Sequence, residues 1–473
     1  MSLRGKLVLF WMKHRPRHIA TTQMVALMFA AIILLGALLL TLPAASRDGV
    51  SCGLRPALFT ATSATCVTGL VLYDTWSQWS GFGQVVILCL IQIGGLGFMS
   101  VATLLIFLLR RKVSLRQRLM IAQSLSVSDI MGVVRLQKLV IVGSFCVEAV
   151  GALILTLRFW PAYGLGKALS WGVFHSVSAF CNAGFDIFGS IAPGQSLTEF
   201  HTDPVVLLTL AALIIIGGLG FLAWENIAQK RSFRKFSVYT KLVLLMTAAL
   251  LAAGWAGICL LEWNNPETLG GMTVGEKLLN GFFQSATLRT AGFAAIDQAK
   301  LTESGKAFSC VLMFIGGSSG STAGGIKTVT NLQEGDDAGI KTVTFLVLVL
   351  TIWARARGKR AVCAFKRTIP DEQTQNAMII AFIVLALAVF GGIFISATSP
   401  MSFTDAIYEA ISALATVGLS AGGTASLSIP AQILIIVYMY FGRVGVLTIS
   451  LGFLAGKQAE ERFRYAETNL LIG

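Results

Sequence analysis

The stretch Ser63–Leu70 reads SATCVTGL, and three later stretches repeat its pattern: Ser178–Phe185 (SAFCNAGF), Ser285–Phe293 (SATLRTAGF) and Ser412–Leu419 (SALATVGL). Each contains a glycine followed by a large apolar residue, and an aromatic residue stands ten positions before each glycine. The glycines are Gly69, Gly184, Gly292 and Gly418, and the aromatic residues are Phe59, Phe174, Phe282 and Tyr408. The third stretch has one extra residue between its Ser-Ala pair and its glycine. Spacings of 108 to 126 residues between the glycines indicate four domain-sized repeats rather than a solenoid.

The composition is that of a polytopic membrane protein. Of 473 residues, 55% are hydrophobic and only 13% are charged, and the mean hydropathy is +0.75. Because backbone groups in lipid must be satisfied internally, apolar runs of about 20 residues favour spanning helices. We therefore expect an all-α integral membrane protein.

The basic residues, which give a formal charge of +14, gather in five clusters between the repeats. The clusters are Arg4–Arg17, Arg110–Lys138, Lys230–Lys241, Arg355–Arg367 and Lys457–Arg464. The positive-inside rule places all five in the cytoplasm, with both termini, and places the glycine loops toward the outside. Contact with anionic membrane lipid accounts for the clusters, so a nucleic-acid partner is not expected.

Each repeat is predicted to consist of a long helix, a short re-entrant helix, a glycine loop and a second long helix. The first long helices are expected at Thr22–Leu42, Leu139–Phe159, Tyr239–Leu261 and Gln375–Ala397. The short helices are expected at Leu54–Thr65, Ala168–Phe180, Val274–Ala286 and Phe403–Ala415. The second long helices are expected at Gly83–Leu109, Pro204–Ala228 and Ala431–Ala455 in the first, second and fourth repeats, and the one in the third repeat is expected to start near Gly305. This predicts eight spanning helices around a pseudo-fourfold cation pore, with repeat boundaries 1–112, 113–235, 236–360 and 361–473.

The second long helix of the third repeat is interrupted by Gly316–Gly325, which reads GGSSGSTAGG. Such a stretch forms helix poorly, and it is tolerated in a membrane only where it is buried in protein or lines a water-filled cavity. GIKTVT then occurs twice, at Gly325–Thr330 and at Gly339–Thr344, around an acidic segment. A natural tandem duplication and an engineered insertion both account for this repeat.

The four glycine loops suit a cation that has lost its water, because backbone carbonyls from four segments can replace the hydration shell. Glycine tolerates positive φ, and the short helices point their negative dipole ends at the loops. The alternative is that each glycine merely ends a re-entrant helix. Four matched loops favour the pore.

These motifs resemble the Trk/Ktr/HKT superfamily of potassium transporters over nearly the whole chain. The resemblance rests on TATSATCVTGL, FHSVSAFCNAGFD, FFQSATLRTAGF, EAISALATVGL, GGSSGSTAGGIKT and the FGRVG of Phe441–Gly445. It is strongest to the Ktr-type pore-forming subunit of the bacterial plasma membrane. It implies homodimers, a cytoplasmic RCK-type regulatory ring that binds ATP/ADP or NAD(H), and stimulation by Na⁺. Cys181 departs from the family, which usually has a polar residue there.

The predicted filter comprises the glycine and the three residues before it in each loop. These are Cys66, Val67, Thr68 and Gly69; Cys181, Asn182, Ala183 and Gly184; Arg289, Thr290, Ala291 and Gly292; and Ala415, Thr416, Val417 and Gly418. K⁺ is expected at the backbone carbonyls of Val67, Thr68, Asn182, Ala183, Thr290, Ala291, Thr416 and Val417.

Arg443 is a charged residue in an otherwise apolar predicted helix, and such residues are usually functional. Our hypothesis is a gate in which Arg443 bonds the free carbonyls of the interrupted helix; the alternative is an arginine that only ties two helices together. The gate residues are Gly316, Gly317, Ser318, Ser319, Gly320, Ser321, Thr322, Ala323, Gly324, Gly325, Lys327 and Arg443. Lys327 and Lys341 either flank the gate or reach the membrane surface.

Five acidic residues are predicted to face outward, where they either concentrate cations or are ordinary solvated charges. They are Asp74, Asp186, Glu199, Asp203 and Asp297. The GGLG motifs at Gly94–Gly97 and Gly217–Gly220 are interpreted as helix-packing glycines rather than nucleotide-binding loops. We expect no enzyme but gated K⁺ uptake, with a Na⁺- or H⁺-coupled symporter or a non-transporting receptor as alternatives.

Overall fold

The computed structural model describes residues 21–97, 100, 103–104, 132–318, 320–323, 342–358, 362–364, 367–369 and 371–444. Nearly all regular structure in these ranges is helical, as predicted. One antiparallel hairpin pairs β1 (Val362–Ala364) with β2 (Arg367–Ile369), with Val362 opposite Ile369.

Four short, largely buried helices precede the four glycine loops. They are α3 (Leu54–Thr65), α9 (Leu165–Phe180), α13 (Val274–Thr287) and α17 (Phe403–Leu414). The predicted short helices agree with them to within three residues at the start and one at the end. Local capping explains two of the starts, since Thr273 and Glu276 form a capping box on α13 and the Ser402 hydroxyl accepts the Asp405 N–H on α17.

A long helix lies before each short helix and packs along it. These helices are α2 (Thr21–Thr41), α8 (Val133–Tyr163), α12 (Val238–Glu262) and α16 (Asp371–Thr398). The predicted long helices coincide with them in order and position. Each short helix is therefore buried against an apolar neighbour from its own repeat.

A third helix follows each glycine loop. The four are α5 (Gly81–Leu96), α10 (Pro204–Gly218), α14 (Glu303–Ile315) and α18 (Ile429–Val444). The prediction of one continuous helix over Pro204–Ala228 was wrong: α10 ends at Gly218, and α11 (Phe221–Lys230) turns away by 92°. Similarly α5 ends at Leu96 instead of running on to Leu109 as one helix. Gly220 and Gly97 have φ of 92° and 82°, which a right-handed helix cannot accommodate, so both GGLG motifs end a helix.

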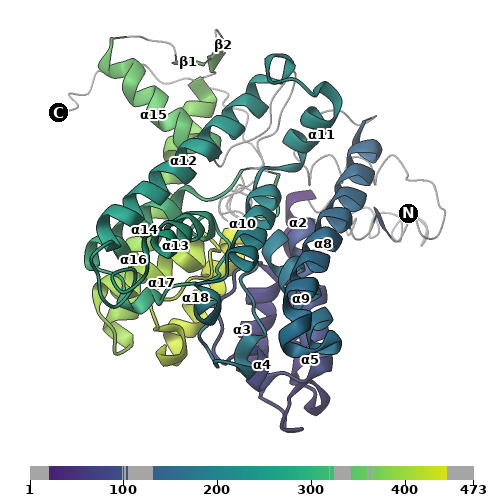
Figure 1. Cartoon of the computed structure of the whole chain (residues 1–473). Helices are drawn as coiled ribbons and strands as arrows, with labels where there is room; N and C mark the ends of the chain where they lie inside the picture. Colours follow the sequence, from purple (N-terminus) through teal and green to yellow (C-terminus); the bar gives the residue numbers. More distant parts are fainter. Residues whose placement is uncertain are drawn as a thin grey trace, which may run out of the picture.

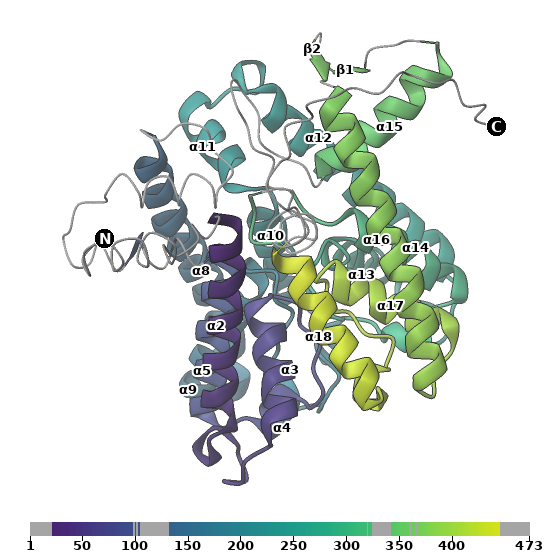
Figure 2. The same cartoon turned by 180° about the vertical axis from the view of Figure 1, so that it is seen from behind.

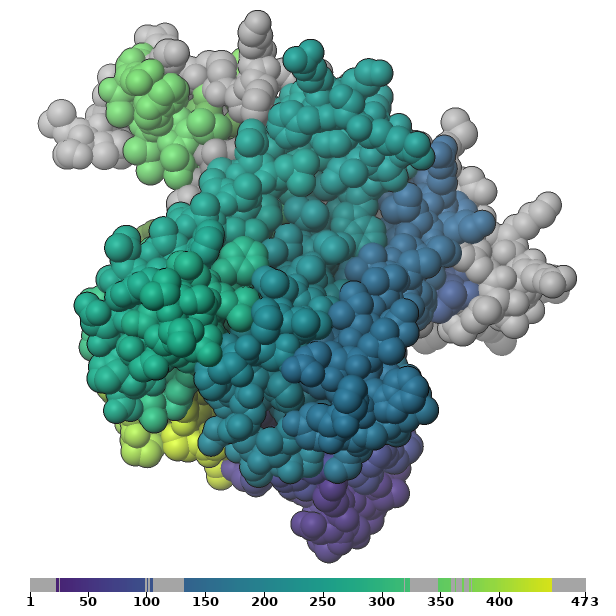
Figure 3. All heavy atoms as spheres, in the orientation of Figure 1, coloured from purple at the N-terminus to yellow at the C-terminus, as the bar shows by residue number. Residues whose placement is uncertain are grey.

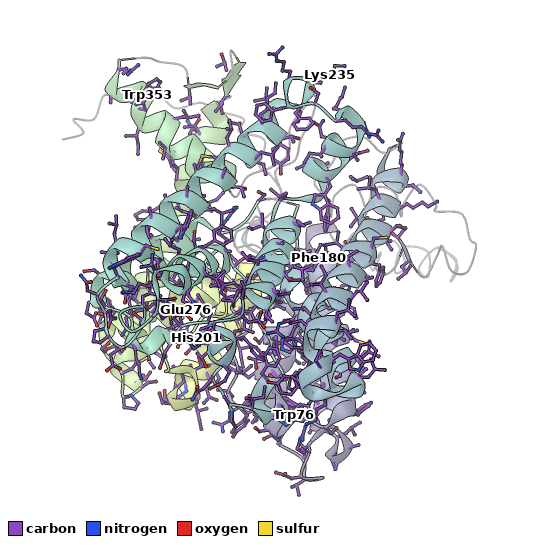
Figure 4. The ribbon with its side chains drawn as sticks, in the orientation of Figure 1. Trp76, Phe180, His201, Lys235, Glu276 and Trp353 are labelled. Atoms are coloured by element: carbon purple, nitrogen blue, oxygen red, sulfur yellow. The ribbon has the colours of Figure 1, made fainter. Side chains whose placement is uncertain are left out.

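The remaining elements are short, apart from α15 (Thr342–Ala356). They are α4 (Thr75–Gln78) and the 3₁₀ helices Pro43–Ala45, Phe188–Ser190, Thr198–Phe200, Phe233–Lys235, Gln298–Lys300 and Thr424–Ser426. The hairpin, α11 and α15 lie at one end of the molecule, away from α4 (Figure 1). Lys235 and Trp353 mark that end and Trp76 the opposite end, with Phe180 between them (Figure 4).

The helices of successive repeats pack in a closed order. The helix after each loop contacts the short helix of the next repeat: α5 with α9, α10 with α13, and α14 with α17. The last contact joins the fourth repeat to the first, because α18 packs against α3, and Figure 2 shows α18 beside α3 and α2. Figure 3 shows the face on which atoms of the second and third repeats lie side by side.

Among the described residues, three helices are long and apolar enough to cross a membrane by length and composition. They are Val133–Tyr163, Val238–Glu262 and Ala377–Thr398, and the bent pair α10 and α11 gives a fourth if it is counted as one span. Shorter apolar helices cover Ala26–Thr41, Gly81–Leu96 and Ile429–Val444. Eight spans remain a prediction.

Candidate functional site

The four glycines of the repeated phrase lie against one another in a closed cycle. A Cβ atom added to Gly69 would lie 2.5 Å from the Ala183 carbonyl oxygen. One added to Gly184 would lie 2.7 Å from the Ala291 oxygen, and one added to Gly292 would lie 2.7 Å from the Val417 oxygen. At Gly418 it would meet the Thr68 oxygen, which returns the cycle to the first loop. Each glycine is therefore needed for the close approach of the next loop's carbonyl.

The same backbone conformation recurs in all four loops. The glycines have φ between 68° and 98°, and the residue two positions earlier also has positive φ: Val67 (56°), Asn182 (57°), Thr290 (71°) and Thr416 (50°). Positive φ is uncommon for any non-glycine residue and an outlier for β-branched ones, which three of these are. Backbone strain of this kind persists only where the surroundings impose it, and it clusters at functional sites.

Hydrogen bonds from the end of each short helix hold the loop in this shape. In the first loop the Thr68 N–H donates to the Ser63 carbonyl at 2.8 Å, and the Gly69 N–H donates to the Ser63 hydroxyl at 3.1 Å. Ser412 makes the same pair of bonds with Val417 and Gly418 in the fourth loop. The helix end and the glycine thus form one braced unit.

The third loop contains no inserted residue. Gly292 lies ten residues after Phe282, as in the other repeats, and the positive φ at Thr290 lies two residues before the glycine as elsewhere. The Ser-Ala pair is instead displaced by one position, so Ser285 bonds the Leu251 carbonyl rather than the loop. Thr287 takes over the brace and donates to the Phe293 carbonyl at 2.7 Å, much as Ser178 donates to Phe185.

One side chain, that of Asn182, connects the second and third loops. The Asn182 amide donates to the Arg289 carbonyl at 3.3 Å. The Arg289 side chain is 7% exposed, and its Nε and Nη2 atoms have no hydrogen-bond partner. Among the described residues, no group of three or more His, Cys, Asp or Glu side chains is placed to hold a metal ion. The oxygen atoms that approach one another at this site are backbone carbonyls.

The interrupted helix of the third repeat folds against the other repeats. After α14 ends, Gly316 has φ of 57°, and the chain docks on the end of α10 through Ser318 N–H to Gly218 O (3.0 Å) and Thr322 N–H to Gly217 O (3.2 Å). The Thr322 hydroxyl donates to the Phe180 carbonyl at 2.8 Å, at the base of the second loop. The described part of this segment therefore lies on the side of the loops where the short helices end.

Arg443 is 2% exposed and joins this segment to the first repeat. Its Nη1 donates to the carbonyls of Thr322 (2.8 Å) and Ala323 (3.3 Å). Its Nη2 donates to the carbonyls of Gly94 and Gly95, the latter at 3.1 Å. Both acceptors on α5 belong to its last turn, where unpaired carbonyls favour a cation. One guanidinium thus links three repeats.

Several predicted residues lie outside the described residues. They are Ser319, Gly324, Gly325, Lys327 and Lys341, with most of the repeated GIKTVT and the acidic segment between its copies.

The predicted outward acids have mixed roles. Asp74, Asp203 and Asp297 accept N–H groups at the starts of α4, α10 and the 3₁₀ helix Gln298–Lys300, so they serve as helix caps. Asp186 follows the second glycine by two residues, and burial together with the nearby charge of Asp74 raises the pKa of Asp186 to about 7.

Comparison with known proteins identifies the family. The TrkH family, described as cation transport protein, matches residues 5–463. The chain belongs to this family. The TrkH-family relatives include the potassium/sodium uptake protein NtpJ of Enterococcus hirae, which is 36% identical over 98% of this chain and 99% of its own length. The Ktr system potassium uptake protein B of Bacillus subtilis is 36% identical over the full length of both chains, and that of Vibrio alginolyticus is 36% identical over 95% and 94%.

The TrkH-family fold is also found in a solved structure. The potassium transporter TrkH from Vibrio parahaemolyticus superposes with a TM-score of 0.68, covering 93% of this chain and 86% of that one at 17% identity. This similarity supports the architecture alone.

In this TrkH-family chain the helix after three of the four loops carries a second repeated glycine. The sequence analysis interpreted Gly94 and Gly217 as packing glycines but did not notice that Gly442 corresponds to them. A Cβ on Gly94, Gly217 or Gly442 would strike the backbone carbonyl of Thr65, Phe180 or Leu414 respectively, in each case the residue four positions before the loop glycine. The signal was present in GGLG, GGLG and GRVG, which align once this position is known. Arg443 then stands where the first two repeats have Gly95 and Gly218.

The TrkH-family chain also has a buried carboxylate that the sequence reasoning passed over. Glu148 is 4% exposed in the long apolar helix α8, and the Gln92 amide donates to its two oxygens at 3.0 and 3.1 Å. The Cys181 thiol lies 3.9 Å from Glu148 Oε1. A single glutamate within an apolar run was the available signal.

Proposed function

We propose that this protein mediates potassium uptake through a pore whose selectivity filter is formed by the four glycine loops. The observation that carries the proposal is the closed cycle in which each loop glycine touches a carbonyl of the next loop. The closed packing order of the helices supports a pseudo-fourfold arrangement around it. Relatives that align over nearly their whole length bear the names of potassium uptake proteins.

Potassium binds to backbone carbonyls in this proposal, at the two residues before each glycine. The positive φ at Val67, Asn182, Thr290 and Thr416 sets the orientation of the backbone at these positions. Four short helices end at the loops, so their negative dipole ends favour a cation there. Cys66, Cys181, Arg289 and Ala415 are the first residue of each filter segment.

Arg443 and the segment from Gly316 to Gly325, with Lys327, form the gate. Four carbonyl contacts hold the arginine between the interrupted helix and the end of α5, where its charge repels a passing cation. Opening requires these contacts to break, so the gate is a two-state element.

The proposed membrane arrangement has eight spans in four repeats, 1–112, 113–235, 236–360 and 361–473, in a bacterial plasma membrane with both termini in the cytoplasm. The ring of helix contacts and the positive-inside distribution of basic residues support it. The protein works as a homodimer on a cytoplasmic RCK-type ring that binds ATP/ADP or NAD(H), with Na⁺ as activator. The naming of the relatives as parts of a Ktr system supports a regulatory subunit. The chain itself is a transporter and not an enzyme.

A H⁺- or Na⁺-coupled K⁺ symporter using the same pore is the second candidate. The observation that favours it is Glu148, a carboxylate buried in a helix long enough to span the membrane and 3.9 Å from a filter side chain. Carboxylates in such positions often carry protons or cations.

The test is flux of K⁺, Rb⁺ and Na⁺ into liposomes that contain the purified protein, with and without the cytoplasmic ring. We expect K⁺ and Rb⁺ to pass in preference to Na⁺, without any requirement for a second ion. Saturating flux that depends on Na⁺ or on a pH gradient would favour the symporter, and no flux of any of the three ions would refute the proposal.

A further inference from the structure

Each glycine loop has a part before the glycine and a part after it, and the helix-end hydrogen bonds described above reach at most one residue beyond the glycine, at Phe185 and Phe293. The segment after the glycine needs its own support if the carbonyl ring is to keep its shape, because a functional constellation must be held to within about 0.5 Å. In the second repeat this support comes from His175, nine positions before Gly184. Its Nδ1–H donates to the Trp171 carbonyl at 2.7 Å, which leaves Nε2 to accept the Ile187 N–H at 3.2 Å.

Glu409 occupies the same position in the fourth repeat, nine residues before Gly418, and its exposure is 0%. Its carboxylate accepts the Ser420 hydroxyl through Oε1 and the Thr424 hydroxyl through Oε2, at 2.9 Å for the latter. None of the ion pairs found within the described ranges involves Glu409. The carboxylate therefore accepts two hydroxyl groups from residues 420–424, the segment directly after the glycine.

Tyr408, the preceding residue, reaches in the other direction. It is fully buried, and its hydroxyl donates at 3.0 Å to the Gln298 side-chain oxygen, six residues after Gly292 in the third repeat. Gln298 is further fixed by a 2.6 Å bond from the Gln284 amide and by its own bond of 2.7 Å to the Ile296 carbonyl. Two consecutive residues of α17 thus support two different loops.

We propose that Tyr408 and Glu409 are positioning residues for ion selection, which fix the segments after Gly292 and Gly418 and so hold two of the four loops in register. The inference rests on the proposed filter and deepens it. Neither side chain touches the ion. A side chain that acts in this way should change which ion passes while leaving the protein folded and conducting.

The experiment measures the ratio of K⁺ to Na⁺ flux in liposomes for Tyr408→Phe and Glu409→Gln. Tyr408→Phe removes one hydrogen bond without changing shape, and we expect the ratio to fall about threefold. Glu409→Gln replaces one acceptor oxygen with a donor that faces other donors, and we expect a fall of about tenfold with K⁺ flux retained. The exposed Tyr73→Phe and Glu267→Gln are matched controls that should keep the ratio.

Ser420→Ala and Thr424→Ala provide a milder test if Glu409→Gln does not fold, because each removes one donor and should lower the ratio by a smaller factor. Glu409→Gln combined with Ser420→Ala should be no worse than Glu409→Gln alone, since both act through the same bond. An unchanged ratio in folded Tyr408→Phe and Glu409→Gln refutes the positioning role. Gly418→Ala is measured in the same assay. If Gly418→Ala lowers the K⁺ to Na⁺ ratio and Tyr408→Phe and Glu409→Gln do not, only the positioning role is refuted. If Gly418→Ala also leaves the ratio unchanged, the proposed filter is refuted.

Discussion

Replacing Gly69 by alanine should damage ion selection without preventing folding. Two effects add at this residue. Its φ of 98° costs an L-residue roughly 1–2 kcal/mol, and the new Cβ would lie 2.5 Å from the Ala183 carbonyl oxygen. Carbon and oxygen atoms do not approach closer than about 3 Å without a shift, so the Ala183 carbonyl must retreat by about 0.5 Å. That displacement equals the tolerance within which a binding site keeps its function.

We expect the K⁺ to Na⁺ flux ratio of Gly69→Ala to fall about tenfold, which corresponds to about 1.4 kcal/mol of lost discrimination. Paired flux measurements of the two ions in liposomes test this. Gly53→Ala is the matched control, because Gly53 has φ of 83° but no atom within 4 Å of an added Cβ. It should lose a similar amount of stability and keep its selectivity. A folded Gly69→Ala protein with the parental ratio would refute the reasoning.

Three further predictions concern charged groups. Arg443→Gln loses most of the four carbonyl contacts and should raise K⁺ flux about tenfold, whereas an unchanged rate in folded protein would remove Arg443 from the gate. Because burial, and then the charge of Asp74, raises the pKa of Asp186 to about 7, Asp186 loses its negative charge as the pH falls through 7. Cation flux should fall with it, and Asp186→Asn should flatten that pH profile; identical profiles would contradict this. Asp203 caps α10 and pairs with Arg158 at 2.8 Å. Asp203→Ala should lower the free energy of unfolding by about 1–2 kcal/mol, measured by thermal unfolding, and Asp203→Asn, which keeps the cap, should lower it clearly less. Equal losses of stability in the two variants would count against the capping role.

The short helices were predictable because local signals and burial agree there. At α3 the predicted and observed bounds are both Leu54–Thr65, since an apolar run ends at a small-residue loop whose glycine must take positive φ. The helices after the loops were predicted less well. An apolar run continues through Gly97 and Gly220, and hydropathy does not register the positive φ that ends the helix at these two residues.

The candidate site was likewise predictable from the sequence only in part. Arg443 was recognisable because a charge in an apolar helix is conspicuous, and its bonds to Thr322 and Ala323 lie where the hypothesis placed them. Its bonds to the end of α5 span some 350 positions of sequence and have no local signature. The support from Tyr408 and Glu409 was not predictable for the same reason. Tyr408 was recognised only as one of the four repeated aromatic residues, and its bond to Gln298 joins residues 110 positions apart.

The contact between α18 and α3 joins the last described helix to the first short one, and it has a consequence for biosynthesis. While the ribosome is still making the fourth repeat, the first three can pair only as an open arc. The cycle of glycines cannot close until α17 delivers Gly418 to Thr68, so the complete ring of loops exists only after the fourth repeat has been made.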